Sequence, residues 1–278
     1  MRFAALLLLA CSKPFPDDGS ETALLLAVSP AESTVYTSPE GAAAQFTLTT
    51  TRTDGSSEVL PEAEWTLSNH TIGEIDESGA FTASIDNGGV AYVNARYAGL
   101  EASALLTVVF QDEIVGEGVD PASFDVPKTT HTGLWAYPPD GVNLPRNTPS
   151  LQFQWADVGA TAARLRFRSS VTDLSVYTTG TSWTADEATW AALVGTNAGG
   201  SVDVELSLVV GAEVWSEEIV TINVNRFDAR GSIYYWSTSA SDAASWNMVT
   251  KRSVVVATIC RVASGDAPKP RRSQVTTL

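Results

Sequence analysis

The sequence contains very little cysteine, histidine or methionine. Each of these residue types occurs only twice among 278 residues. Zinc sites are built from clustered cysteine and histidine, so a metal centre of that kind is excluded. Cys260 has no C-x-x-C partner, which excludes haem attachment by the usual motif and makes redox chemistry unexpected. We therefore expect no metal or cofactor, His70 and His131 on the surface, and stability that comes from hydrophobic cores.

Motifs that carry catalysis are also absent. The chain has no G-x-S-x-G elbow, no phosphate-binding Walker loop and no dinucleotide-binding glycine pattern. Asp76, Glu77, Asp86 and Asp120 are the candidates for an acid pair or for calcium ligands. Because the chain has 32 acidic residues, chance clustering explains them better. The sequence predicts a protein that is not an enzyme.

Positive charge is scarce and unevenly spread. Seventeen basic against 32 acidic residues give a net charge of −15, which disfavours nucleic acid and acidic membrane surfaces as partners. Residues 243–278 are the exception, with six basic residues and one acidic residue, Asp266. A natural basic tail and a truncated or frameshifted reading frame both account for this reversal. Residues from Asp266 onward are expected to be disordered.

The only long apolar run lies at the N-terminus. Phe3 to Ala10 are all apolar and follow Arg2. About 20 apolar residues are needed to cross a bilayer, so this run is too short, and its layout is that of an export signal. The alternative is a buried strand or helix that ends in a cysteine.

Leu8-Leu9-Ala10-Cys11 resembles a bacterial lipobox. The resemblance implies that residues 1–10 are a lipoprotein signal peptide and that Cys11 is the lipid attachment site. Two or more acyl chains anchor a protein stably to a membrane. Ser12 stands where aspartate often signals inner-membrane retention, so the resemblance favours the outer membrane. Residues 11–22 are polar and contain two prolines, which predicts a tether.

Residues 23–110 consist of short β-runs separated by turn residues, as expected of a sandwich. Five segments occur in the order and spacing typical of one family: Trp65–Asn69, Ile72–Asp76, Ser78–Thr82, Gly89–Tyr97 and Ala104–Val109. Together they resemble the bacterial Ig-like group 2 domain. The resemblance implies an Ig-like sandwich with Trp65 in its core. Gly79 suits a turn with positive φ between two strands.

A second β-region follows a predicted linker, residues 111–133, which is acidic and rich in glycine and proline. The proline-bearing loop that begins at Tyr137 and the strand that ends at Trp155 resemble the opening of a fibronectin type III-like domain, here assigned to residues 134–226. Thr184–Glu187 has the spacing of a capping box and predicts one short helix. Strands 202–210 and 215–224 are expected to pair across a turn at Gly211.

Two sets of side chains are candidates for binding. Arg164, Arg166 and Arg168 alternate with apolar residues, so they share one strand face. That face is expected to pair with cross-strand acids such as Asp203 and Glu205, and the alternative is an anionic polymer. Trp135, Tyr137 and Trp236 lie at predicted domain edges. Inter-domain packing is the favoured role for these rings, and stacking on a glycan is the alternative.

The predicted fold is therefore all-β, with two tandem Ig-like and fibronectin-like β-sandwiches between a disordered N-terminal tether and a basic C-terminal tail. Residues 227–278 contain an aromatic strand and this tail. The predicted function is that of a lipid-anchored cell-envelope protein whose modules act as spacer and as adhesive or protein-binding domains. Its partners would be the membrane, through the anchor, and a surface protein or polysaccharide. The alternatives are a carbohydrate-binding module and the N-terminal accessory part of a larger secreted protein.

Overall fold

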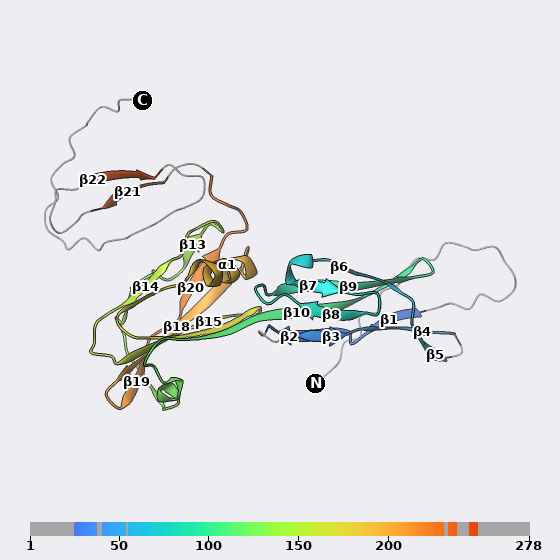
Figure 1. The fold of residues 1–278 in the computed structure, drawn as a ribbon, viewed down its shortest axis with the longest axis horizontal. Helices are drawn as coiled ribbons and strands as arrows, with labels where there is room; N and C mark the ends of the chain where they lie inside the picture. Colours follow the sequence, from blue (N-terminus) through green and yellow to red (C-terminus); the bar gives the residue numbers. More distant parts are fainter. Residues whose placement is uncertain (1–24, 38–40, 54, 231–232, 238–244, 250–278) are drawn as a thin grey trace, which may run out of the picture. The chain divides into compact units, whose positions relative to one another are not determined.

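The computed structural model describes residues 25–37, 41–53, 55–230, 233–237 and 245–249. The predicted signal peptide, Cys11, Ser12 and most of the basic tail lie outside these residues. The described chain is all-β apart from one α-helix and two short 3-10 turns, and it forms two compact units (Figure 1). Unit 1 contains residues 25–35, 43–83 and 90–107, and unit 2 contains residues 36–42, 84–89 and those from 108 onward.

Unit 1 is built from short antiparallel strands, with β2 as an additional neighbour of β10. Strand β4 pairs with β1 and β5, strand β8 pairs with β3 and β7, and strand β9 pairs with β6 and β10. The elements are β1 (Leu25–Ser29), β2 (Glu32–Tyr36), β3 (Ala43–Gln45), β4 (Thr47–Thr51), β5 (Ser57–Leu60), β6 (Glu64–Leu67), η1 (His70–Ile72), β7 (Gly73–Ile75), β8 (Ala80–Ala83), β9 (Gly89–Tyr97) and the first part of β10 (Leu100–Val115).

The alternating pattern of the sequence places one face of strands such as β4 and β9 in the core of unit 1. Ala91, Val93 and Ala95 of β9 are buried, as the alternation predicts. Phe46 lies between β3 and β4, is fully buried, and donates its backbone N–H to the Gly79 carbonyl at 2.9 Å. Phe46 thus separates β3 from β4.

Gly79 and Trp65 form one local structure in unit 1. Gly79 has φ +78°, which confirms the predicted turn. A Cβ at this position would lie 2.4 Å from the Phe46 carbonyl oxygen and 3.0 Å from the Trp65 ring. The sequence predicts Trp65 in the centre of the core. In the structure it is half-buried and covers the turn at the margin of the core.

Unit 2 contains a large mixed sheet and a small antiparallel one. The large sheet has the order β10-β16-β15-β18-β19-β11, with β20 beside β18 and β13 beside β20, and the small sheet has the order β12-β14-β17. The elements are η2 (Pro121–Phe124), β11 (Lys128–Thr130), β12 (Trp135–Tyr137), β13 (Val142–Leu144), β14 (Gln152–Trp155), β15 (Ala162–Ser169), β16 (Thr172–Thr178), β17 (Ser182–Thr184), α1 (Glu187–Thr196), β18 (Ser201–Val210), β19 (Glu213–Ser216) and β20 (Val220–Val224).

Aromatic rings fill the core between these two sheets. Phe153 and Phe167 are fully buried and meet edge to face, with 5.1 Å between ring centroids. Trp155 is buried, as expected from its place at the end of a strand, and its indole donates to the Gly180 carbonyl at 3.1 Å. Trp190 of α1 also enters this core and donates to the Thr148 carbonyl at 2.7 Å. Both buried indoles therefore keep a hydrogen bond.

The predicted helix is present, but its N-cap differs from the prediction. The side chain of Asp186, not that of Thr184, accepts the Thr189 backbone N–H at 2.9 Å. The helix ends at Thr196, with Asn197 as C-cap. The hairpin at Gly211 is also present, between β18 and β19. The strand expected over 215–224 is split into β19 and β20, which pair with opposite ends of β18.

Beyond β20, residues Ile233–Ser237 form β21 and Ser245–Val249 form β22. The two strands pair antiparallel, with Trp236 opposite Trp246. The predicted aromatic strand is therefore a hairpin strand. The side chains of these two strands lie outside the described part.

Candidate functional site

Of the three rings for which glycan stacking is the alternative role, Trp135 and Tyr137 do not form an exposed platform. Tyr137 is 8% exposed and belongs to the core of unit 2, and burial raises the pKa of its hydroxyl. Trp135 is half-buried against the same core. Its indole nitrogen is buried and has no hydrogen-bond partner among the described residues. The Trp236 side chain is outside the described part, as are Cys11 and Ser12. Tyr137 thus has no ring face available to a sugar.

The arginine row lies on the outer face of the large sheet, as the alternation predicts. Leu165 and Phe167 of β15 are fully buried, whereas Arg164, Arg166 and Arg168 alternate with them. The Arg166 guanidinium donates two hydrogen bonds to the Asp173 carboxylate, each at 3.0 Å. This bidentate contact raises the pKa of Arg166, chiefly through the hydrogen bond.

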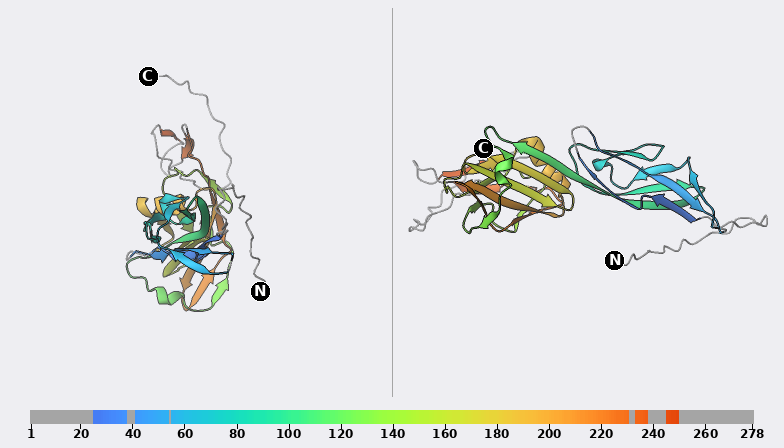
Figure 2. Two further views of the ribbon diagram at one scale, coloured as in Figure 1. Left: turned by 90° about the vertical axis from the view of Figure 1, so that its right-hand side faces the viewer. Right: turned by 90° about the horizontal axis from the view of Figure 1, so that it is seen from below.

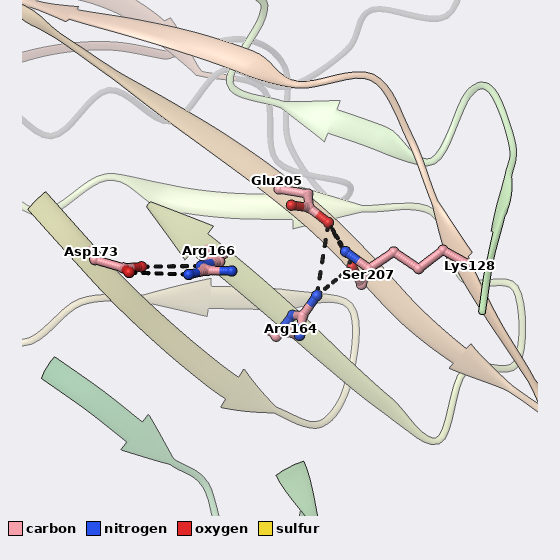
Figure 3. Close-up of polar contacts among 6 residues, drawn as sticks. All are labelled: Lys128, Arg164, Arg166, Asp173, Glu205 and Ser207. Carbon is pink, nitrogen blue, oxygen red and sulfur yellow. Dashed lines mark hydrogen bonds and ion pairs between the residues drawn. The ribbon is translucent and has the colours of Figure 1, made fainter. Parts of the chain in front are cut away.

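Glu205 is the second acid on this face, and two cations share it (Figure 3). The Lys128 ammonium contacts its carboxylate, and Arg164 lies 3.8 Å from the same oxygen. Burial by itself would raise the pKa of Glu205, but the hydrogen bond from Lys128 and the charges of Lys128, Arg164 and Arg166 outweigh it, so the pKa is lowered. The predicted pairing with Glu205 is confirmed. Asp203 instead accepts a hydrogen bond from Thr221.

Lys128 reaches this face because residues 116–131 pack against the rest of unit 2. This segment is here called the strap. Phe124 of η2 is buried edge to face against Tyr177, with 5.5 Å between centroids, and the Arg164 guanidinium lies 5.4 Å from its ring centroid. Strand β11 then pairs in parallel with β19. Figure 1 and Figure 2 show η2 as a green coil beside the strands of unit 2.

The strap differs from the linker predicted for residues 111–133. The first five of those residues continue β10, which pairs in parallel with β16, and the rest include η2 and β11. His131, expected on the open surface, is half-buried and stacks on Trp215 with 3.9 Å between centroids. Acidic residues, glycine and proline dominate this segment, so no local pattern indicated its pairing. The one sequence feature that indicates packing of this segment is Phe124, an aromatic residue between two polar ones.

Beside the arginine row lies an open groove of about 560 Å³. Its walls come from β10, β15 and β16, together with Thr37. The lining residues are Thr37, Gln111, Asp112, Glu113, Arg164, Arg166, Asp173, Ser175 and Tyr177. All of them belong to unit 2. The groove therefore contains both signs of charge, one phenol ring, hydroxyls and an amide.

Two of the four candidate carboxylates, Asp76 and Asp120, have structural roles. Asp76 accepts the backbone N–H groups of Ser78 and Ala80 and the Ser78 hydroxyl, and the hydroxyl bond is the main cause of its lowered pKa. Asp120 caps η2 by accepting the Ala122 N–H at 3.0 Å. Within the described ranges, no group of three or more His, Cys, Asp or Glu side chains is arranged to hold a metal ion. Across the same residues, no helix has the length and apolar character needed to span a membrane.

No protein-family model matches the chain, and no curated protein sequence matches it. Among solved structures, a tandem of titin Ig domains is similar with a TM-score of 0.26 and 10% identity, over 72% of this chain and 96% of that one. An ICAM-5 ectodomain fragment is similar with a TM-score of 0.23 and 11% identity, over 78% of this chain and 55% of that one. Scores this low support no argument about function.

Proposed function

We propose that this protein is a non-catalytic, lipid-anchored module of the bacterial cell envelope. Its two β-sandwich units serve as a spacer and as adhesive or protein-binding domains. The anchor is a diacylated Cys11, and Ser12 directs the chain to the outer membrane. Neither assignment involves a described residue, so both depend on the sequence of the first twelve residues.

The proposal that the protein is non-catalytic is supported by the ion pairing of the charged side chains in unit 2. Cross-strand ion pairs form a cluster on the large sheet, in which Asp173 holds Arg166, and Glu205 holds Lys128 and Arg164. The pKa of Glu205 is lowered. A general acid needs a raised pKa so that it keeps its proton near neutral pH, so Glu205 is unsuited to that role. The cluster instead links strands to one another and to the strap.

The anchor is tested by the intact mass of protein extracted from membranes, with Cys11→Ser as the matched variant. Cleavage before Cys11 together with added acyl chains, both lost in Cys11→Ser, is the expected result. An uncleaved and unmodified chain in the soluble fraction would refute the anchor and the envelope assignment together.

The adhesive role is tested by binding of the purified protein to intact cells and isolated envelopes. We expect saturable retention that heat unfolding of the β-units abolishes. Retention that is linear in concentration and unaffected by unfolding would leave only the spacer role.

A further inference from the structure

The groove beside the arginine row is shaped by one small residue. In the strand register, Ser175 of β16 lies between Glu113 of β10 and Arg166 of β15. Its short side chain leaves a depression between a carboxylate and a guanidinium. Asp173 and Tyr177, its same-face neighbours on β16, bound the depression along the strand.

Both walls offer hydrogen-bonding groups that the fold leaves partly unused. Asp112 and Glu113 are exposed and form no ion pair with any other described residue. Arg164 is 12% exposed, and its nearest carboxylate is 3.8 Å away and shared with Lys128. Its Nε is buried without a hydrogen-bond partner in the described part of the chain. A buried donor without a partner is costly, so this guanidinium is incompletely satisfied.

The mixture of charges decides which ligand fits. A polyanion would meet Asp112, Glu113 and Asp173, and a polycation would meet Arg164 and Arg166, so either would face like charges in the groove. A neutral ligand rich in hydroxyl groups avoids this conflict. Each hydroxyl donates one hydrogen bond and accepts others, so it can donate to the carboxylates and accept from the guanidinium groups.

We propose that the groove over Ser175 is a binding site for a neutral saccharide. Its volume of about 560 Å³ lies within the range of about 300–1,000 Å³ typical of small-ligand sites. Glu113 and the Gln111 amide contact the ligand from the β10 wall, and Arg166, oriented by Asp173, contacts it from the β15 wall. The site is distinct from Trp135 and Tyr137, and it does not depend on the lipid anchor.

The test is retention of the full-length chain on an array of immobilised glycans. The array contains neutral gluco-, manno-, xylo- and chito-oligosaccharides, together with uronic-acid and sulfated glycans. Three variants accompany the wild type. Ser175→Trp fills the depression, Glu113→Gln removes an exposed carboxylate with little effect on folding, and Arg168→Gln changes an arginine on the same strand face outside the groove.

We expect the wild type to retain at least one neutral glycan. Affinity should fall at least tenfold in Ser175→Trp and about fivefold in Glu113→Gln, and should not change in Arg168→Gln. A melting temperature for each variant separates loss of binding from loss of fold, and Glu113→Gln decides the case if Ser175→Trp does not fold. Retention of acidic glycans only, of no glycan at all, or of neutral glycans equally by wild type and Glu113→Gln would overturn the proposal.

Discussion

Replacing Phe124 with alanine should weaken the packing of the strap against the rest of unit 2. The ring is 3% exposed and packs in a small cluster with Ala162, Tyr177 and Val214. Truncating a buried phenylalanine in a core costs about 3–5 kcal/mol, because it leaves a cavity as well as losing burial. This cluster is small and lies on the outer face, so it can partly collapse, which favours the lower end. Loss of the Arg164 contact accounts for roughly 0.5–1 kcal/mol of the total. We expect a loss of about 3 kcal/mol.

Hydrogen exchange measures this loss locally. The His131 N–H donates to the Ser216 carbonyl at 2.7 Å, and it exchanges only when the strap opens. Since each 1.4 kcal/mol is tenfold, a loss of 3 kcal/mol should speed its exchange by roughly 100-fold. Amides in the middle of β15 should change much less, because the main core of unit 2 remains intact.

Phe227→Ala is the matched control, because that ring is 74% exposed in the same unit. It should change stability by no more than about 0.5 kcal/mol. Exchange at His131 that stays at the wild-type rate in Phe124→Ala would show that the ring does not hold the strap. Equal acceleration in the two variants would refute the reasoning from burial.

Four further predictions concern other parts of the fold. The pKa of Glu205 is lowered from its ordinary value of 4.5. Its ion pairs therefore stabilise unit 2 fully above about pH 4.5, and this stabilisation is lost as the pH falls through the folded-state pKa. Urea unfolding should show the loss of stability in the wild type and a weaker dependence on acid pH in Glu205→Gln. Gly79→Ala should destabilise unit 1 by more than about 2 kcal/mol in fluorescence-monitored unfolding, because φ is +78° and a Cβ would lie 2.4 Å from the Phe46 carbonyl oxygen. Gly99 has φ +79° but open space around it, so Gly99→Ala should cost only about 1 kcal/mol in the same assay. Asp186→Ala removes the N-cap of α1 and should lower the stability of unit 2 by about 1 kcal/mol, measured by calorimetry, whereas Asp186→Asn should cost much less. Tyr137→Ala should lower the melting temperature by several degrees, because the ring is buried. An unchanged melting temperature would refute the role of this ring in the core.

Much of the fold could be predicted because it depends on patterns among residues that are close together in the sequence. Alternating apolar and polar residues indicated strands such as β15, and the capping-box spacing of Thr184–Glu187 indicated a helix start close to the observed one. The positive φ of Gly79 followed from its place in a hairpin. The candidate groove was not predictable, because its walls come from strands distant in sequence. Only the register places Glu113, Ser175 and Arg166 side by side.

The sequence by itself determined the all-β class, the short helix, the buried face of β15 and the presence of an acid beside the arginine row. These features depend on residues two to four positions apart, whose periodicity defines which face is apolar. The tertiary structure alone decided the course of the strap, the division of residues 215–224 into two strands and the burial of Tyr137. Parallel pairing with a distant strand depends on which sheet edge and which outer face remain uncovered once the core has formed. A local pattern does not contain that information.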